Sequence, residues 1–370
     1  MSSILTVSHF YESHGGGLER VAGHLHRQFA ALGHEALWAA SGSGAGIPGA
    51  VPLPCVNPTE ALTGLPMPIP GPRALASLWR AVGRADALVI HDALYLTSIT
   101  ALAMGRLRRK RVVLIQHIAA IPFASPLLRG VMRLANWLVT RPMLAMADEV
   151  VFISATVRAD LLGEPPRRSC HLVFNGVDGA VFHADGEKAE LPGAGRKVLF
   201  AGRFVEKKGL AVLRALAAMR GDCSFLLAGG GPIDPAQWGL ANVHMLGMQS
   251  AEELARLYRA ADLLLLPSVG EGYPLVIQEA MACGLPVVCG APAHRADPGA
   301  AAWLRGVPID LADAAGSARA CAAAIDALHP DAAERAAMAA YAARLYSWRA
   351  MALAVLACAR NADSIGSARV

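Results

Sequence analysis

Short apolar runs alternate with segments of helical period along most of the chain. The first run, residues 3–7, is followed by a glycine-rich loop and then by a segment that is helical in pattern up to Gly33. The apolar residues of that segment share one helical face: Leu18, Val21, Leu25 and Phe29. Another apolar run follows at residues 35–39. This order predicts a βαβ unit whose glycine loop lies at the carboxyl edge of the sheet.

The same alternation continues through the rest of the chain. Further strands are predicted at residues 87–91, 111–116, 149–153 and 171–174, and then at residues 198–201, 224–228, 243–245, 262–266 and 286–288. Apolar runs separated by helices are typical of parallel, doubly wound sheets that are buried on both faces. An alanine-rich tract at residues 311–360 is helical by propensity.

The two series of strands predict two Rossmann-like domains of the α/β class. Between them, residues 183–196 are polar, rich in Gly, Ala and Pro, and without an apolar period, which is typical of a linker. We therefore place an N-terminal domain at residues 1–185 and a C-terminal domain at residues 186–345. The last segment, residues 346–370, is expected to form a helix that packs back on the N-terminal domain.

Composition agrees with two domains and indicates in which cellular compartment the protein is expected. A chain of 370 residues is too long to fold around one hydrophobic core of ordinary size. Its 54% hydrophobic and 17% charged residues exclude a disordered protein. No run of about 18 uncharged apolar residues is present, and residues 1–10 lack a basic leader, so we expect a cytoplasmic protein. The seven cysteines are scattered without a C-x-x-C pair, which argues against disulfides and against a zinc site.

The positive charge of the chain is concentrated in one segment. Residues 92–148 contain eight bases and no acid between their terminal aspartates, whereas the rest of the chain has 26 bases against 29 acids. The eight bases are Arg106, Arg108, Arg109, Lys110, Arg111, Arg129, Arg133 and Arg141. This asymmetry favours an anionic surface as partner over a generally basic protein. No nucleic-acid partner is expected. Three of these arginines recur with Trp137 every four residues, as in an interfacial membrane helix, although arginines are also ordinary on the outside of a domain helix.

Two loops combine glycine or basic residues with the start of a helix. Residues 15–17, three glycines, could present backbone N–H groups to a phosphate, or form a plain turn; Arg20 departs from the G-x-G-x-x-G fingerprint. In the second domain, Arg203 and Lys208 lie five residues apart between a predicted strand and helix. Two cations at a helix start favour a diphosphate, and the alternative is a solvated charge run.

The segment SVGEGYPLVIQEAMACGLPVV carries two glutamates, Glu271 and Glu279, separated by seven residues. Pro274 suits a first helical turn, so Glu271 is expected in the loop and Glu279 within the helix, about two turns away and near the same face. Their flanks are apolar, and a carboxylate in such surroundings needs hydroxyl or cationic partners. The pattern therefore favours a ligand site over two solvated acids.

These motifs together resemble a family 4 glycosyltransferase with the GT-B fold. They are the E-x7-E pair, the loop G-R-F-V-E-K-K-G, the tetrapeptide N-G-V-D, the GGG-x-E-R loop and the later Tyr346-Ser347-Trp348. The resemblance implies two facing Rossmann-like domains and transfer of a sugar from a nucleotide diphosphate sugar to a glycan or lipid-linked acceptor. It also implies retention of anomeric configuration, no required metal or other cofactor, and a place in cell-envelope polysaccharide or glycolipid synthesis.

The resemblance assigns roles to single residues. Arg203 and Lys208 would hold the diphosphate, Glu279 the ribose, and Glu271 the transferred sugar. His117, after the strand at 111–116, matches a histidine beside the donor sugar; the alternative is a satisfied histidine at a strand end. The implied catalytic residues are His117, Glu271, Arg203 and Lys208. The implied donor-binding residues are Gly16, Gly17, Arg203, Lys208, Glu271, Gly272, Tyr273, Pro274, Leu275 and Glu279.

Other functions stay open at this level. The loop CGAPAHRADPGAAAWLRG lacks the glycine pair and acid that the family commonly has there, so the donor sugar cannot be inferred from the family. A nucleotide-sugar epimerase or a glycosyl phosphorylase would also use two Rossmann-like domains. A non-catalytic sugar-binding protein would have no need of Arg203, Lys208, Glu271 and Glu279 together. His91 and Asp92, at another strand end, are interpreted as structural.

Overall fold

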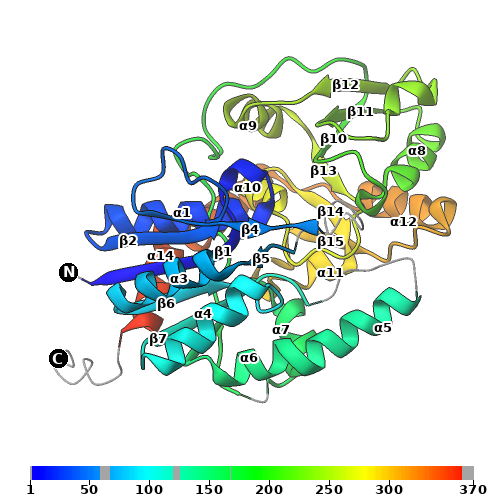
Figure 1. Ribbon diagram of the computed structural model, residues 1–370. Coiled ribbons are helices and arrows are strands. Elements are labelled where there is room, and N and C mark those ends of the chain that lie inside the picture. The colour runs from blue at the N-terminus through cyan, green and yellow to red at the C-terminus, as the bar shows by residue number, and fades with distance from the viewer. Residues whose placement is uncertain (1, 59–66, 120–125, 167, 361–370) are drawn as a thin grey trace. The chain divides into compact units, whose positions relative to one another are not determined.

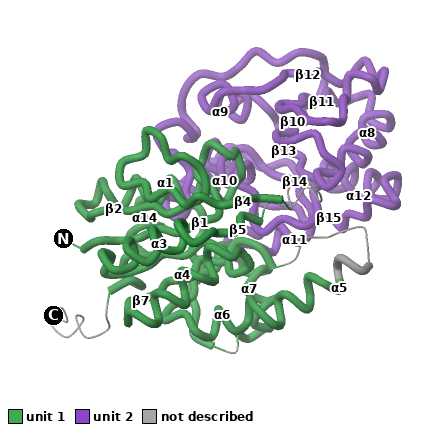
Figure 2. The backbone as a smooth tube through the Cα atoms, viewed as in Figure 1, with its two compact units in different colours: residues 1–175, 348–370 green, residues 176–347 purple. Residues whose placement is uncertain are grey.

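A computed structural model describes residues 2–58, 67–119, 126–166 and 168–360, without the side chains of residues 126–129. The chain divides into two compact units, one formed by residues 1–175 with 348–370 and the other by residues 176–347 (Figure 2). Within the second unit, Val177 pairs with Ser347 and its N–H donates to the carbonyl of Tyr346. The chain therefore enters and leaves that unit through neighbouring segments.

Unit 1 is built on a seven-stranded sheet in which all strands are parallel (Figure 1). In spatial order its strands are β3 (Ala50–Leu53), β2 (Glu35–Ser41), β1 (Ser3–Phe10), β6 (Ala87–His91), β7 (Arg111–Gln116), β8 (Glu149–Phe152) and β9 (His171–Leu172). The strand order reverses between β1 and β6, and in such sheets ligands bind at the carboxyl ends of the strands beside that point.

Helices complete unit 1 around this buried sheet. They are α1 (Gly17–Ala31), α3 (Pro72–Arg84), α4 (Leu96–Leu107), α5 (Pro126–Ala135), the π-helical turn η2 (Asn136–Thr140), α6 (Arg141–Met146), α7 (Ala155–Leu162) and α14 (Trp348–Ala359). Two short strands, β4 (Cys55–Val56) and β5 (Ile69–Pro70), form a separate antiparallel pair, and η1 (Glu12–His14) precedes α1. The interior strand residues Leu5, Leu88 and Leu114 are fully buried, because both faces of a parallel sheet are covered.

Unit 2 repeats the same architecture with six parallel strands. Their spatial order is β12 (Val243–Gly247), β11 (Cys223–Ala228), β10 (Arg196–Ala201), β13 (Leu263–Leu266), β14 (Val287–Gly290) and β15 (Leu304–Val307). The helices are η3 (Glu206–Lys208), α8 (Leu210–Met219), η4 (Pro235–Trp238), α9 (Ala251–Ala260), α10 (Leu275–Ala282), α11 (Ala291–His294), η5 (Pro298–Ala300), α12 (Ala314–Asp326) and α13 (Ala332–Leu345). The predicted pair of parallel α/β domains is confirmed.

Two sequence expectations about chain organisation differ from the structure. The predicted linker, residues 183–196, belongs to unit 2, where Arg259 of α9 donates to the carbonyls of His183 and Glu187. The units divide at 175/176 and 347/348, whereas the sequence placed boundaries at 185 and 345. Of the alanine-rich tract, α12 and α13 lie in unit 2 and α14 lies in unit 1, where Arg111 donates to the carbonyl of Cys358.

Candidate functional site

Polar side chains gather where three neighbouring strands of unit 1 end. β1 ends with His9 and Phe10, β6 ends with His91, and Gln116 and His117 lie at and just beyond the end of β7. Because these strands are parallel and adjacent, the polar residues meet at one edge of the sheet. His9, His91 and His117 are almost completely buried, at 3%, 0% and 5% exposure. Buried imidazoles need hydrogen-bond partners. Each of these rings has one, whereas Nδ1 of His9 and Nε2 of His91 are buried without a partner among the described residues.

His117 and His91 form one of these pairs. Nδ1 of His91 lies 3.0 Å from Nε2 of His117, so one ring donates a proton and the other accepts it. Burial lowers the pKa of His117 to about 3 and holds the pKa of His91 well below its usual value. Both rings are therefore neutral near pH 7, and their tautomers are linked. The pairing occupies Nε2 of His117, and Nδ1 of that ring has no hydrogen-bond partner among the described residues.

Asp92 fixes the turn that carries His117. Its backbone has a φ of 58°, the left-handed region, and its Oδ1 accepts the N–H groups of His117 at 2.8 Å and Ile118 at 3.4 Å. Burial raises the pKa of Asp92 to about 7, although those two hydrogen bonds act in the opposite direction. Asp92 and His91 both contact His117, and their interpretation as structural residues stays a prediction.

A second pair, His9 and Glu19, was not identified as functional from the sequence. Nε2 of His9 lies 3.0 Å from Oε1 of Glu19, and both side chains are buried. The His9 ring stacks on Tyr95 with 3.8 Å between ring centres. Burial acts to raise the pKa of Glu19, but the hydrogen bond and charge of His9 outweigh it, and the pKa is lowered. The available signal was the acid in GGG-x-E-R, since it falls in the first turn of α1.

Gly16 and Gly17 lie at the start of α1, where the sequence predicted phosphate binding. A Cβ at Gly16 would collide with the carboxylate of Glu19, while a Cβ at Gly17 would meet nothing within 4 Å. Gly16 therefore gives Glu19 room to fold back over the helix start, where a negative charge is favourable. The carboxylate of Glu19 thus lies at the helix start where the sequence predicted a phosphate. The role of both glycines toward a donor stays a prediction.

Charged residues gather at the carboxyl edge of the unit 2 sheet. Lys208 ends η3, directly before α8, and its Nζ lies 2.5 Å from Oε1 of Glu271. Gly209 has a φ of 75°, and a Cβ there would collide with the carbonyl of Pro267, so only glycine allows this turn to approach β13 closely. Arg203, in the same loop, is exposed, and in the described part of the chain its guanidinium has no hydrogen-bond or ion-pair partner.

The two glutamates of the E-x7-E pair differ in their surroundings. Glu271 precedes α10 and accepts a hydrogen bond from Ser268 at 3.1 Å in addition to its ion pair. Glu279 lies within α10 and accepts from the hydroxyl of buried Tyr258 at 3.2 Å. The expectation that Pro274 lies in the first helical turn is wrong: Pro274 is the N-cap, and α10 begins at Leu275. The helix start, from Gly272 to Leu275, follows Glu271 directly.

The side chain of Tyr273, predicted to bind the donor, faces the interior. Its hydroxyl lies 2.9 Å from that of Tyr346, which donates to Asp297 at 2.6 Å. Asp297 also accepts from Tyr341 at 2.9 Å and belongs to the loop that departs from the family pattern. These residues tie that loop to the helix α13. A donor contact through the backbone N–H of Tyr273, directly before α10, stays a prediction.

The predicted site residues therefore form two groups, one on each unit. His117 lies in the unit 1 cluster, and Arg203, Lys208, Glu271 and Glu279 lie in unit 2. In the part of the chain that the structure describes, no three His, Cys, Asp or Glu side chains lie close enough together to hold a metal ion. Hydroxyl, carboxylate and cationic groups in unit 2 suit a polyhydroxylated ligand that carries a diphosphate.

Family models match both halves of the chain. Residues 15–180 match the model described as Glycosyltransferase Family 4, and residues 195–329 match the model described as Glycosyl transferases group 1. A curated relative, D-inositol 3-phosphate glycosyltransferase of Salinispora tropica, is 35% identical over 184 residues, which are 40% of this chain and 38% of the relative. The aligned part thus spans little more than a third of that relative.

Solved structures resemble almost the whole chain at low identity. A sucrose-phosphate synthase from Thermosynechococcus elongatus has a TM-score of 0.71 and 20% identity, covering 99% of this chain and 100% of the other. Anabaena Alr3699/HepE, crystallised in complex with UDP, has a TM-score of 0.68 and 16% identity, covering 96% and 99%. At these identities the likeness concerns the fold, which is GT-B.

Proposed function

The chain belongs to the glycosyltransferases of family 4, and on that premise we propose that it transfers a sugar from a nucleoside diphosphate sugar to a glycan or lipid-linked acceptor. The observation that carries the proposal is the loop group of unit 2, in which Lys208 is paired with Glu271 and Arg203 is unpaired among the described residues. HepE, whose fold this chain shares, has also been crystallised with UDP-glucose. A diphosphate fits two cations that belong to one loop.

Charge development explains how these residues would promote transfer. When the bond between sugar and diphosphate breaks, negative charge grows on the diphosphate and positive charge on the sugar. Arg203, Lys208 and the N–H groups at the start of α10 are fixed donors that bind the departing diphosphate more strongly than the intact donor. These cations supply the stabilisation that the reaction needs, so the proposal requires no metal. We propose retention of configuration on the family assignment.

Two further residues have roles defined by their hydrogen-bonding capacity. Glu271 would accept hydroxyl groups of the transferred sugar and Glu279 those of the ribose, since carboxylates accept strong hydrogen bonds from hydroxyls. His117 is neutral, so its free Nδ1 would meet a sugar hydroxyl as a dipole and not as a cation. Placement of the reaction in cell-envelope polysaccharide or glycolipid synthesis is part of the proposal.

Release of nucleoside diphosphate from a panel of UDP- and GDP-sugars tests the function. We expect one donor to raise the melting temperature, because a ligand that binds only the folded state stabilises it, and to release its nucleotide faster with acceptor present. Sugar 1-phosphate formed from a glycan and inorganic phosphate, without turnover of any nucleotide sugar, would indicate a phosphorylase. Isomerised nucleotide sugar without release of nucleotide would indicate an epimerase. Stabilisation without any turnover would indicate a binding protein.

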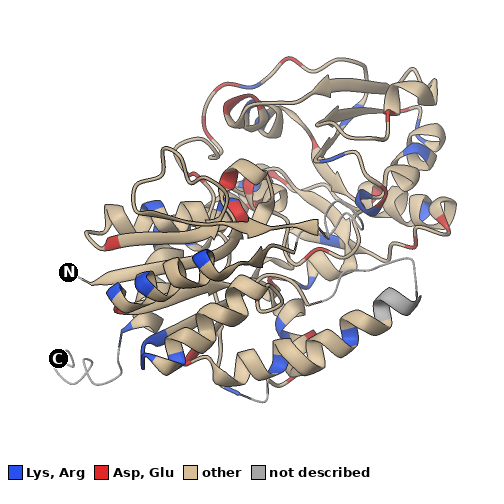
Figure 3. Cartoon of the chain, viewed as in Figure 1, with Lys and Arg blue, Asp and Glu red and all other residues tan. Residues whose placement is uncertain are grey.

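A membrane surface is proposed as the place where a lipid-linked acceptor is met. The helices α5 and α6 with the turn between them expose Val131, Leu134, Trp137 and Leu138, each by more than half. Basic residues, coloured blue in Figure 3, recur along the same helices, and all of them are arginines. Arg133 and Arg141 are exposed. The side chain of Arg129, the third arginine of the predicted stripe, lies outside the described residues. Among the described residues, no helix is long and apolar enough to span a bilayer.

Sedimentation with anionic vesicles tests this contact. The triple variant Arg129→Glu, Arg133→Glu and Arg141→Glu should lose binding at low salt, because each base near an anionic surface contributes roughly 1 kcal/mol. The matched control reverses three exposed arginines elsewhere, Arg214→Glu, Arg319→Glu and Arg349→Glu, and should still bind. Equal binding by the two variants, or no binding by the wild type, would contradict the membrane proposal and leave the transfer proposal intact.

A further inference from the structure

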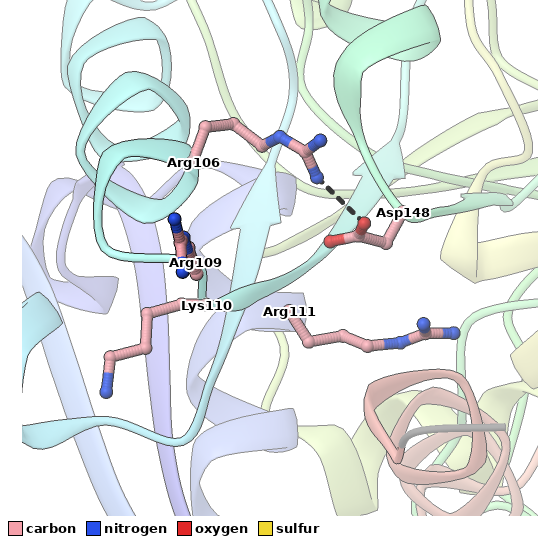
Figure 4. A pocket seen from close by; sticks show the side chains of 5 residues that line it. All are labelled: Arg106, Arg109, Lys110, Arg111 and Asp148. Atoms are coloured by element: carbon pink, nitrogen blue, oxygen red, sulfur yellow. Dashed lines mark hydrogen bonds and ion pairs between the residues drawn. The ribbon is translucent and has the colours of Figure 1, made fainter. Parts of the chain in front are cut away.

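A basic pocket lies at the opposite edge of the unit 1 sheet from the histidine cluster. It has a volume of about 230 Å³ and is lined by Arg106, Arg109, Lys110, Arg111 and Asp148 (Figure 4). Arg111 is the first residue of β7, whereas His117 follows its last residue. Six residues of strand separate these two positions by roughly 20 Å. A ligand in this pocket would therefore be distinct from any ligand of the histidine cluster.

The acids around the pocket neutralise only part of its charge. Arg106 pairs with Asp148 at 2.8 Å, and Arg111 pairs with Glu149 at 2.8 Å. Asp148 is further engaged, since its second oxygen accepts the N–H of Val112. Two of the four bases, Arg109 and Lys110, have no acidic partner among the described residues. The pocket and its two acids thus have a net charge of +2.

Arg109 stands where a helix end normally has glycine. The N–H of Lys110 donates to the carbonyl of Gly105 and the N–H of Arg109 to that of Arg106, which is the Schellman pattern at the end of α4. Arg109 has a φ of 52°, a left-handed conformation that glycine adopts freely and that costs other residues conformational free energy. The arginine side chain at the pocket therefore stands at a position where the backbone conformation favours glycine.

We propose that this pocket binds a phosphomonoester dianion through Arg109 and Lys110, with Arg106 and Arg111 at its rim. The net charge of +2 matches the charge of such a group, and a guanidinium offers two parallel donors to phosphate oxygens. The phosphomonoester belongs either to a small soluble metabolite or to a lipid headgroup. Leu107 and Met146, next to the pocket in the chain, expose 76% and 47% of their surface, which suits the second source.

Calorimetric titration with inorganic phosphate tests the soluble source. The full chain is used with Arg203→Ala and Lys208→Ala, so that the proposed diphosphate site does not take up the phosphate. We expect one phosphate to bind, with affinity reduced at least about tenfold by an added Arg109→Gly, because a hydrogen bond to a charged group is lost. An added Arg73→Ala, which removes an exposed arginine of α3 in the same unit, should leave the affinity unchanged.

Vesicle binding tests the lipid source. Vesicles of phosphatidylcholine with phosphatidic acid, a phosphomonoester, are compared with vesicles brought to the same surface charge with phosphatidylserine, a phosphodiester. A preference for phosphatidic acid that Arg109→Gly abolishes and Arg73→Ala keeps assigns the pocket to a lipid headgroup. Phosphate binding without that preference assigns it to a soluble phosphomonoester.

Thermal unfolding excludes a purely structural role for these bases. Basic residues stabilise the end of a helix by complementing its dipole, so a structural role alone predicts that Arg109→Gly lowers the melting temperature. We expect the melting temperature to stay equal or rise, because glycine suits this backbone conformation. The proposal is overturned if Arg109→Gly binds phosphate and phosphatidic acid as the parent protein does, or if the parent protein binds neither.

Discussion

The two groups of candidate site residues handle charge in opposite ways. In unit 1 the ionisable side chains are buried among strand ends, and burial keeps His91 and His117 neutral. In unit 2 the ionisable side chains are paired or exposed: Lys208 and Glu271 form an ion pair, and Arg203 is exposed. Neutral, buried groups orient a ligand by hydrogen bonds, whereas partly hydrated cations respond to charge that develops during a reaction.

On the proposed function, unit 1 would recognise its ligand by hydrogen bonds and unit 2 would stabilise the departing diphosphate. The two carboxyls of unit 1 refine the contrast. The pKa of Asp92 is raised to about 7 mainly by burial, while the pKa of Glu19 is lowered because His9 outweighs burial. Substitutions in unit 1 and substitutions in unit 2 should therefore differ in their effects on turnover, nucleotide affinity and stability.

The largest effect on turnover is expected when the cations of unit 2 are removed. Arg203→Ala and Lys208→Ala should each lower turnover by about 100-fold or more, because each removes a donor that strengthens as charge develops. Circular dichroism and the melting temperature should stay near the wild-type values for Arg203→Ala, since Arg203 is exposed. Turnover close to wild type in both variants would refute the assignment of the diphosphate to this loop.

Substitution of each of the two glutamates of unit 2 should affect the affinity for free nucleoside diphosphate differently. Glu279→Gln should weaken binding of the free nucleoside diphosphate about tenfold, as expected when a carboxylate that accepts from the ribose is neutralised. Glu271→Gln should leave that affinity unchanged or tighter, because Glu271 is the counterion of Lys208, and should lower turnover and sugar discrimination. Calorimetry measures both affinities. Equal losses in the two variants would contradict the division of roles.

The buried pair of unit 1 should contribute to stability. Glu19→Gln should lower the free energy of unfolding at pH 7 by about 2 kcal/mol, since a charged hydrogen bond to His9 becomes a neutral one. The folded-state pKa of Glu19 is depressed, so its contribution is present above the unfolded-state pKa and is lost as pH falls through the folded value. Urea unfolding at pH 7 and pH 3 should therefore show a smaller difference between variant and wild type at pH 3.

Asp92 should have the opposite pH dependence. Its pKa is raised from 3.8 to about 7, so its contribution is full below pH 3.8 and is lost as pH rises through 7. Asp92→Asn retains an oxygen for the N–H groups of His117 and Ile118 and removes this titration. We expect the variant to gain stability relative to wild type between pH 5 and pH 8 in urea unfolding. A constant difference over that range would show that Asp92 does not titrate there.

The sequence by itself determined the elements and the residue types of the candidate site. The runs at residues 87–91 and 111–116 are strands with those limits, because a parallel strand buried on both faces is a continuous apolar run. β3 and β15 were missed, since their four residues include a proline or an exposed arginine. The loop that joins Arg203 and Lys208 was found because its glycines and cations are contiguous in the chain.

Only the tertiary structure decided which of these residues act on one another. His9 and Glu19 are ten residues apart, and His91 and His117 are 26 apart. The neighbouring strands β6 and β7 bring His91 and His117 together, and the connection from β1 to α1 brings His9 and Glu19 together. No local sequence pattern encodes these contacts. The same holds for Lys208 with Glu271 and for Tyr273 with Tyr346, a contact that places the side chain of Tyr273 in the interior. Periodicity reports the burial of single residues, whereas pairing depends on the order of strands in the sheet, which the packing of the whole chain determines.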